Sequence, residues 1–336
     1  MACKNPSTMT YALMTTTEEI LEPGDRLDHY FIESIVARSG MSVLYKATDM
    51  NSGREVAVKV PHAEMEADPV LHERFERERE IGQEIDHPGV VKVFSGEEQS
   101  RVYMVMEWVP GRLLRSILNR ERKLPIERAI ALTLEICDAM DTMHKHGVVH
   151  RDLKPENLMV SEDDHVKLID FGIAMKEDAR RLTFVNLSAT LGTPDYISPE
   201  QVKGLRGDQR SDIYSLGVIL YEMLTGQVPF TGSNPFAVMN ERLLHDPPSP
   251  RMLNPEISPA LEEILYRALA RDPRHRYATA QEMAWELEHP ELVGVDERGA
   301  DKRGGQRPNR RKMLLYAGLA LIPLALFGLM LALARH

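Results

Sequence analysis

Two short segments in the middle of the 336-residue chain carry side chains whose types and spacing could do chemistry. Residues 150–157 read HRDLKPEN, and residues 169–172 read IDFG. The oxygens of Asn157 and Asp170 are hard donors of the kind that suits Mg²⁺. A lone Asp or Asn is more often a cap or a turn residue, which is the structural alternative. The presence of both complete segments favours a catalytic site.

These segments resemble the catalytic loop and the metal-binding motif of eukaryotic-type (Hanks-type) protein kinases. Phosphoryl transfer depends on positioning and charge neutralisation more than on covalent help. The resemblance implies that Asp152 is the catalytic base for a substrate hydroxyl and that Asn157 and Asp170 bind Mg²⁺ (or Mn²⁺). It also implies that Lys154 contacts the transferred phosphate, as in Ser/Thr kinases, since tyrosine kinases usually have other residues there.

The segment Ala57-Val58-Lys59-Val60 resembles the strand whose Lys holds the α- and β-phosphates of ATP in this family. That Lys is paired with a Glu on a helix, and the run RFERERE offers several acids. Alignment of the family's helix pattern on Phe75 selects Glu78 as the partner of Lys59. The other acids of the run suit a solvated helix face, which is the structural reading for Glu78 as well.

The adenine site is expected at the connection between the lobes. By resemblance, Met106 is the gatekeeper, and backbone groups of Glu107 and Val109 bond the adenine. The apolar walls on either side of the ring are Leu44, Ala57 and Met159.

One element departs from the family pattern. The phosphate loop G-x-G-x-x-G-x-V reads ARSGMSVL here, so that Ala37, Ser39 and Ser42 replace the three glycines, and Gly40 survives as an extra one. Glycine lets backbone amides approach the phosphates and allows positive φ. Ala and Ser are the smallest substitutes. We therefore expect a loop that still covers ATP, with weaker affinity or slower turnover.

Residues 192–200, GTPDYISPE, resemble the substrate-docking end of a kinase activation segment. The resemblance pairs Arg276 with Glu200 and makes Asp212 the buried helix residue that supports the catalytic loop. Arg151 beside the catalytic Asp is typical of kinases switched by phosphate on the activation segment. The candidate acceptors, between which the sequence does not choose, are Thr183, Ser188 and Thr190.

The surrounding pattern predicts an α+β, bilobal fold with a small strand-rich lobe and a larger helical lobe. Alternation predicts strands at residues 30–37, 42–49, 54–61, 90–99 and 101–109, with a charged helix over 69–85 between them. Apolar spacing predicts helices over 126–147, 211–225 and 261–270. Residues 1–29 are interpreted as a flexible N-terminal segment and 30–289 as the kinase domain.

The far end of the chain differs in character. Residues 313–334 are 22 residues without a charge, long enough at about 1.5 Å per residue to cross a bilayer. A buried core helix is the alternative, although such helices are rarely apolar all round. Residues 290–312 are a Gly-rich linker that ends in a basic cluster, which indicates a cytoplasmic flank. We therefore expect a single-pass, tail-anchored protein with its kinase domain in the cytoplasm.

Bulk composition agrees with this reading. The net charge of −10 argues against nucleic acid as a partner, and it hides a basic tail of +7 over residues 298–336. Cys3 and Cys137 are interpreted as free thiols in a reducing compartment.

The sequence predicts an ATP-dependent Ser/Thr protein kinase that acts on proteins, including itself. A pseudokinase scaffold is the first alternative, supported only by the glycine-poor loop. A small-molecule kinase on the same fold is the second, and the intact GTPDYISPE segment argues against it.

Overall fold

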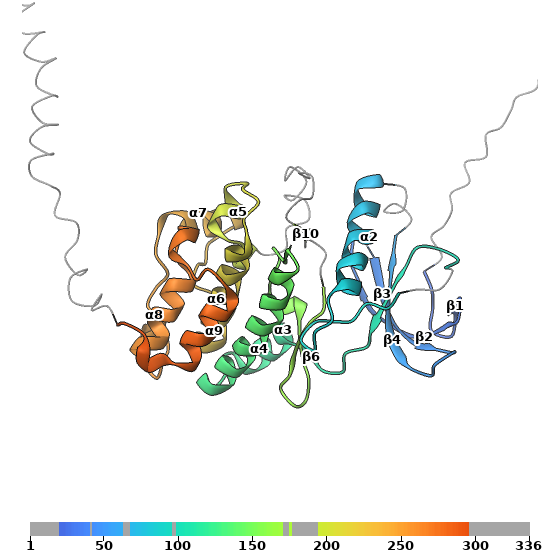
Figure 1. The fold of residues 1–336 in the computed structure, drawn as a ribbon, viewed down its shortest axis with the longest axis horizontal. Coiled ribbons are helices and arrows are strands. Elements are labelled where there is room, and N and C mark those ends of the chain that lie inside the picture. The colour runs from blue at the N-terminus through green and yellow to red at the C-terminus, as the bar shows by residue number, and fades with distance from the viewer. Residues whose placement is uncertain are drawn as a thin grey trace, which may run out of the picture. The chain divides into compact units, whose positions relative to one another are not determined.

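The computed structural model describes residues 20–40, 42–62, 68–95, 99–170, 175–176 and 194–295. The chain divides into two units, Met1–Val293 and Gly294–His336, and almost all described residues belong to the first. Within that unit a strand-rich N-lobe is followed by a helical C-lobe (Figure 1).

The N-lobe is built on an antiparallel sheet of order β1-β2-β3-β4-β5. Its strands are β1 (Arg26–Leu27), β2 (Tyr30–Arg38), β3 (Ser42–Asp49), β4 (Glu55–Pro61) and β5 (Met104–Glu107). The strands expected near residues 30, 42, 54 and 101 are confirmed. The strand expected at 90–99 is wrong: residues 90–93 make only isolated bridges, Val90 to Leu168 and Val93 to Met106.

Helix α2 (Pro69–Glu84) packs one face onto this sheet. Phe75, Glu78 and Ile81 are buried, whereas Glu80 is exposed. Side chains three apart lie on the same helix face, so the apolar pair carries the carboxylate of Glu78 inward.

The C-lobe contains seven further α-helices, two short ladders and several 3-10 turns among its described residues. The helices are α3 (Leu114–Glu121), α4 (Ile126–Lys145), α5 (Pro199–Val202), α6 (Gln209–Thr225), α7 (Pro235–Leu244), α8 (Pro259–Ala268) and α9 (Ala280–Glu288), with α5 a single turn. The ladders are β6 (Arg112–Leu113) with β8 (Leu158–Val160) and β9 (Val166–Leu168), and β7 (Val148–Val149) with β10 (Met175–Lys176). The three predicted helices of this lobe are confirmed as α4, α6 and α8.

The 3-10 helix η1 (Pro155–Asn157) lies inside the HRDLKPEN segment. It leads directly into β8, so the residues expected to do chemistry sit between β7 and β8. Gly111 marks the entry to this lobe. Its φ is +150°, and a Cβ there would lie 2.3 Å from the carbonyl oxygen of Val160, so only glycine fits.

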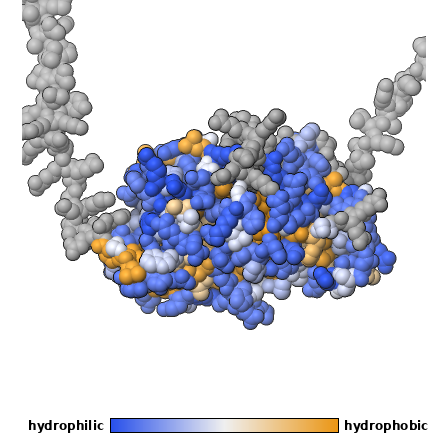
Figure 2. Space-filling view, in the orientation of Figure 1, coloured by the Kyte–Doolittle hydropathy of each residue, from blue (hydrophilic) through white to orange (hydrophobic). Residues whose placement is uncertain are grey.

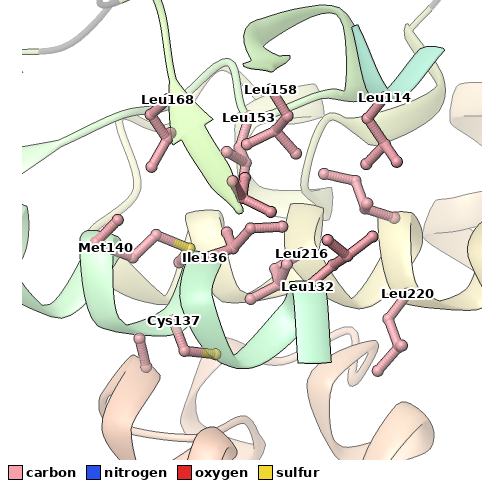
Figure 3. Close-up of a cluster of buried hydrophobic side chains, with 14 of the residues drawn as sticks. Leu114, Leu132, Ile136, Cys137, Met140, Leu153, Leu158, Leu168, Leu216 and Leu220 are labelled. Atoms are coloured by element: carbon pink, nitrogen blue, oxygen red, sulfur yellow. The ribbon is translucent and has the colours of Figure 1, made fainter. Parts of the chain in front are cut away.

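Helix α6 forms the centre of the C-lobe and is buried on nearly all sides. Gly217 lets α8 approach it closely, since an added Cβ would lie 2.9 Å from the Cβ of Ala268. Figure 3 shows Leu153 of the HRDLKPEN segment among core side chains of α4 and α6, such as Ile136 and Leu216. All three residues are fully buried. The loop is therefore anchored to the core by its own apolar residue.

Hydrophilic residues cover most of the face shown in Figure 2, with apolar residues in small separate patches. Among the described residues, no helix is long and apolar enough to cross a membrane. The expected span at 313–334 lies outside the described residues, as do Cys3 and most of the expected linker.

Candidate active site

Lys59 and Glu78 meet between β4 and α2. The Lys59 Nζ lies 2.6 Å from Glu78 Oε1 and 3.4 Å from Asp170 Oδ1. Asp170 follows β9 in the C-lobe, so a single ammonium group joins the sheet, the helix and the other lobe. Of the acids in the RFERERE run, Glu78 is the one that the structure places beside Lys59.

Burial and charge act against each other on these groups. Burial favours the neutral form of Lys59, but the carboxylates of Glu78 and Asp170 outweigh it and raise the pKa of Lys59. Burial raises the pKa of Glu78, against the opposing effect of the Lys59 cation, and the nearby Asp170 raises it further. The Lys59 cation is thus held in place by two carboxylates, one buried and one half-exposed.

Asp152, Lys154 and Asn157 lie together in the catalytic loop. The Lys154 Nζ donates to Asp152 Oδ2 at 2.6 Å, and both side chains are about one-third exposed, at 33% and 35%. The Asn157 Nδ2 donates to the Asp152 carbonyl at 2.9 Å. Ile169 N donates to the Asn157 carbonyl at 3.1 Å, which ties the residue before Asp170 to this loop. The side chains of Asp152 and Lys154 are therefore accessible from solvent, and the backbone of their loop is held from the protein interior.

The residue that supports this loop is Asp212, in the first turn of α6. Asp212 is completely buried. Its two oxygens accept the backbone N–H of His150 at 2.8 Å and that of Arg151 at 2.7 Å. The His144 Nε2 lies 2.9 Å from Asp212 Oδ2. Burial raises the pKa of Asp212, but these hydrogen bonds and the nearby histidines outweigh it, so the pKa is lowered and the carboxylate stays charged.

Arg151 itself has a φ of +65°, a left-handed conformation that is unfavourable for a side chain of this size. Its N–H is held by Asp212, and its carbonyl accepts from Gln201 Nε2 at 2.9 Å. Both backbone groups are therefore fixed by buried side chains, which keep the turn that aims Asp152.

The residues predicted to contact adenine lie on the strands around the lobe connection, except Val109, which follows β5 (Met104–Glu107). Ala57 on β4 is the register partner of Met106 on β5, and both are buried. Leu44 on β3 and Met159 on β8 are half-buried, one from each lobe. The Glu107 N–H donates to the Lys92 carbonyl at 2.9 Å. A hydrogen bond between adenine and the backbone of Glu107 would therefore use the Glu107 carbonyl as the acceptor.

The phosphate-loop residues close the β2–β3 hairpin. Ala37 is the register partner of Leu44, and Gly40 lies at the turn between Ser39 and Ser42. Met41 lies outside the described residues. The Ser42 N–H donates to the Ser39 Oγ at 3.0 Å, a contact that glycine at position 39 could not make.

A buried ion pair holds the end of the segment that is predicted to dock the substrate. The Arg276 guanidinium donates two parallel hydrogen bonds to Glu200, each 2.7 Å long. Ser198 caps α5 through a capping box with Gln201. Phe171, Gly172 and the candidate acceptors Thr183, Ser188 and Thr190 lie outside the described residues.

One group of functional candidates was not predicted from the sequence. The Arg115 guanidinium on α3 donates to Glu156 Oε1 at 2.8 Å, to Glu222 Oε1 at 2.8 Å and to the hydroxyl of Tyr196. It therefore links the catalytic loop, α6 and the docking segment. His144 and Gln201 were missed as well. No local pattern signals them, since each acts on a residue at least 50 positions away.

The residues present fit a divalent cation held mainly by substrate. No group of three or more His, Cys, Asp or Glu that could hold a metal occurs in the described part of the chain. Mg²⁺ is usually bound by one or two protein oxygens together with phosphates and water. Because the Nδ2 of Asn157 is engaged with Asp152, its amide oxygen is the atom that can act as a ligand, together with the half-exposed Asp170 carboxylate.

A cavity of about 180 Å³ in the C-lobe is lined by Phe230, Glu241 and His245 among others. None of the predicted site residues lines this cavity. It plays no part in the site described above.

The protein kinase class is defined by a two-lobed fold with two features. A lysine of the N-lobe sheet is paired with carboxylates, and a buried aspartate in the helical lobe holds the backbone of the catalytic loop. The family model described as "Protein kinase domain" matches residues 31–287. The chain therefore belongs to the protein kinase family, and its domain is of the Hanks type.

Two bacterial proteins are among the similar relatives. The chain is 40% identical over 272 residues to a probable serine/threonine-protein kinase of Streptomyces coelicolor, which covers 80% of this chain and 40% of that protein. It is 38% identical over 292 residues to the serine/threonine-protein kinase PknB of Mycolicibacterium smegmatis, covering 85% of this chain and 45% of the relative. The chain thus spans less than half the length of these relatives.

Among solved structures, the kinase domain of Mycobacterium tuberculosis PknI is similar in fold. The TM-score is 0.63 at 25% identity, and the match covers 81% of this chain and 100% of that one. The bilobal kinase fold expected from the sequence is confirmed by these matches.

Proposed function

We propose that the chain is an ATP-dependent Ser/Thr protein kinase that transfers the γ-phosphate to hydroxyls of proteins, including itself. The observation that carries the proposal is the placement of Lys59 within hydrogen-bonding distance of both Glu78 and Asp170. This arrangement brings a fixed cation from the N-lobe to a carboxylate of the C-lobe, at the junction where ATP would lie.

We assign the adenine to the space between Leu44 and Ala57 above and Met159 below, with Met106 behind it. The carbonyl of Glu107 and the backbone of Val109 would bond the ring. Lys59 would hold the α- and β-phosphates, and residues 37–42 would cover them. These roles agree with the burial of Ala57 and Met106 and with the partial exposure of Leu44 and Met159.

In the catalytic loop, Asp152 would orient the substrate hydroxyl and accept its proton. Its Oδ2 is engaged by Lys154, so we assign proton acceptance to Oδ1. Lys154, whose Nζ lies 2.6 Å from Asp152 Oδ2, would neutralise charge on the transferred phosphate. Asn157 and Asp170 would hold Mg²⁺ (or Mn²⁺), which when bound supplies positive charge to the phosphate oxygens.

The experiment is labelling of the purified full-length chain with Mg·ATP. We expect phosphate on Ser or Thr of the chain itself, and loss of labelling in Lys59→Met. The matched control is Lys46→Met, which removes another strand lysine that is paired with carboxylates, Glu33 and Glu55, on the exposed part of the sheet. Equal labelling of wild type and Lys59→Met would contradict the assignment. An unlabelled wild type would favour the scaffold alternative.

We further propose that residues 30–289 are the catalytic domain, that 290–312 are a basic juxtamembrane linker, and that 313–334 anchor the chain in the cytoplasmic membrane. The support is the charge-free run of 22 residues behind a basic cluster.

Deletion of residues 313–336 should move the protein to the soluble fraction while its activity on a peptide stays near wild type. Basic residues alone give roughly 1 kcal/mol each near anionic lipid, and salt screens them. A full-length chain that salt alone releases would contradict the anchor.

A further inference from the structure

The hairpin that covers the expected phosphate site is closed in an unusual way. Ser39 N donates to the Ser42 carbonyl at 2.9 Å, as in an ordinary antiparallel hairpin. The other closing bond comes from a side chain: the Ser42 N–H donates to the Ser39 Oγ at 3.0 Å. The same hydroxyl lies 3.0 Å from the Ser42 carbonyl, to which it can donate, since a hydroxyl donates once and accepts twice.

The carbonyl of Ser39, which would normally accept from Ser42, instead faces His62. The His62 Nε2 lies 2.9 Å from this oxygen. His62 directly follows β4, the strand that carries Lys59. The tip of the hairpin is therefore tied to the end of the lysine strand while the Ser39 hydroxyl takes over the Ser42 amide.

These contacts give the glycine-poor loop a specific consequence. Glycines in such loops let backbone amides reach the phosphates of the nucleotide. Here the amide of Ser42, which aligns with the third glycine of the family pattern, already has a partner within the loop. A phosphate oxygen has to displace the Ser39 hydroxyl before it can accept from this N–H.

We propose that Ser39 is a positioning residue that acts as a latch: its hydroxyl holds the Ser42 amide inside the hairpin and thereby lowers the affinity for ATP. This inference rests on the proposed kinase function. It differs from a simple shortage of glycine, because it assigns the effect to one hydroxyl group and not to backbone flexibility.

The test compares Ser39→Ala, Ser39→Thr and Ser39→Gly in the full-length chain. Ser39→Ala removes the hydroxyl without adding backbone freedom, and Ser39→Thr keeps a hydroxyl on a residue suited to strands. Ser52→Ala is the matched control, since the Ser52 hydroxyl bonds Asp49 in the next hairpin of the same sheet. Binding of Mg·ATP is measured by calorimetry, KM and kcat by peptide phosphorylation, and the fold by thermal unfolding without nucleotide.

We expect Ser39→Ala and Ser39→Gly to lower both the Kd and the KM for ATP by about two- to tenfold, the effect of one net hydrogen bond. The kcat should stay close to wild type, and Ser39→Thr should bind as wild type does. A gain in Ser39→Gly alone would assign the effect to flexibility and overturn the latch. A higher Kd in Ser39→Ala would mean that the hydroxyl helps to bind ATP, which also overturns it. A wild type that neither binds nor uses ATP would instead refute the proposed kinase function.

Discussion

Replacement of Arg276 by Met should destabilise the C-lobe strongly. The Arg276 side chain is fully buried and donates to both oxygens of Glu200 at 2.7 Å, and also to the carbonyls of Ala270 at 2.7 Å and Arg210 at 2.8 Å. Met fills similar space but leaves the Glu200 carboxylate buried without its cation. Breaking a buried pair from one side costs about 3–5 kcal/mol. At about 2–4 °C per kcal/mol for a domain of this size, the melting temperature should fall by roughly 6–20 °C.

The pH dependence separates this cause from a simple packing defect. Burial raises the pKa of Glu200, but the hydrogen bonds and charge of Arg276 outweigh it, so the pKa is lowered in the folded protein. The pair therefore contributes fully above the ordinary Glu pKa of about 4.3, and its contribution is lost as the pH falls through the lower folded pKa. In Arg276→Met the unpaired carboxylate favours its proton, so the variant should recover relative to wild type as the pH falls.

The assay is thermal unfolding of wild type, Arg276→Met, Glu200→Gln and the double variant, between pH 7 and pH 4. The double variant should lose less stability than the two single losses added together, because the groups interact directly. A melting temperature within 2 °C of wild type for Arg276→Met would refute the reasoning. Such a shift corresponds to a loss of at most roughly 1 kcal/mol, well below the loss expected for a broken buried pair. A stability gap that stays constant with pH would refute the electrostatic part.

Three further predictions concern single buried residues. Asp212→Asn replaces one oxygen acceptor by an amide that cannot accept from the backbone of His150 or Arg151, so unfolding free energy should drop by about 1–3 kcal/mol and kcat should fall, as measured by denaturant titration and peptide kinetics. Glu78→Gln should lower kcat/KM while Glu80→Gln, on the exposed side of α2, should not; equal losses in peptide assays would contradict the pairing with Lys59. Burial raises the pKa of the Cys137 thiol, so in a Cys3→Ser background a thiol reagent should label no cysteine in the native protein and one after denaturation.

Much of the fold could be predicted because its elements carry local periodicity. The strands β2, β3 and β4 alternate, and α4 repeats its apolar residues at helical spacing. The strand predicted at residues 90–99 is wrong for a physical reason. Val90, Val91 and Val93 are apolar and β-branched, but Val90 bridges to Leu168 of β9 and Val93 to Met106 of β5. Because the two partners belong to different sheets, no continuous ladder forms, and no pattern within the segment reports that.

The site shows the same limit. Motif residues such as Asp152 and Asp170 could be proposed because the motifs are short and contiguous. The groups that support them could not, since His144, Gln201 and Arg115 reach the catalytic loop or its neighbours from distant parts of the chain. Likewise, the sequence showed that Ser39 replaces a glycine but not that its hydroxyl accepts from Ser42. The Ser39 carbonyl lies 2.9 Å from His62 Nε2, a residue 23 positions away, which no local pattern signals either.

The central claim is that Asp152 orients a Ser or Thr hydroxyl for attack on ATP. The direct measurement is the single-turnover rate of phosphate transfer to a Ser peptide at saturating Mg·ATP, for wild type and Asp152→Asn, together with the Kd for ATP. Asn has the same size as Asp. Its side chain accepts a weaker hydrogen bond from Lys154, and its amide cannot accept the proton of the substrate hydroxyl. We predict a rate at least about 10²-fold lower with the Kd for ATP unchanged. A variant that transfers phosphate as fast as wild type would contradict the claim.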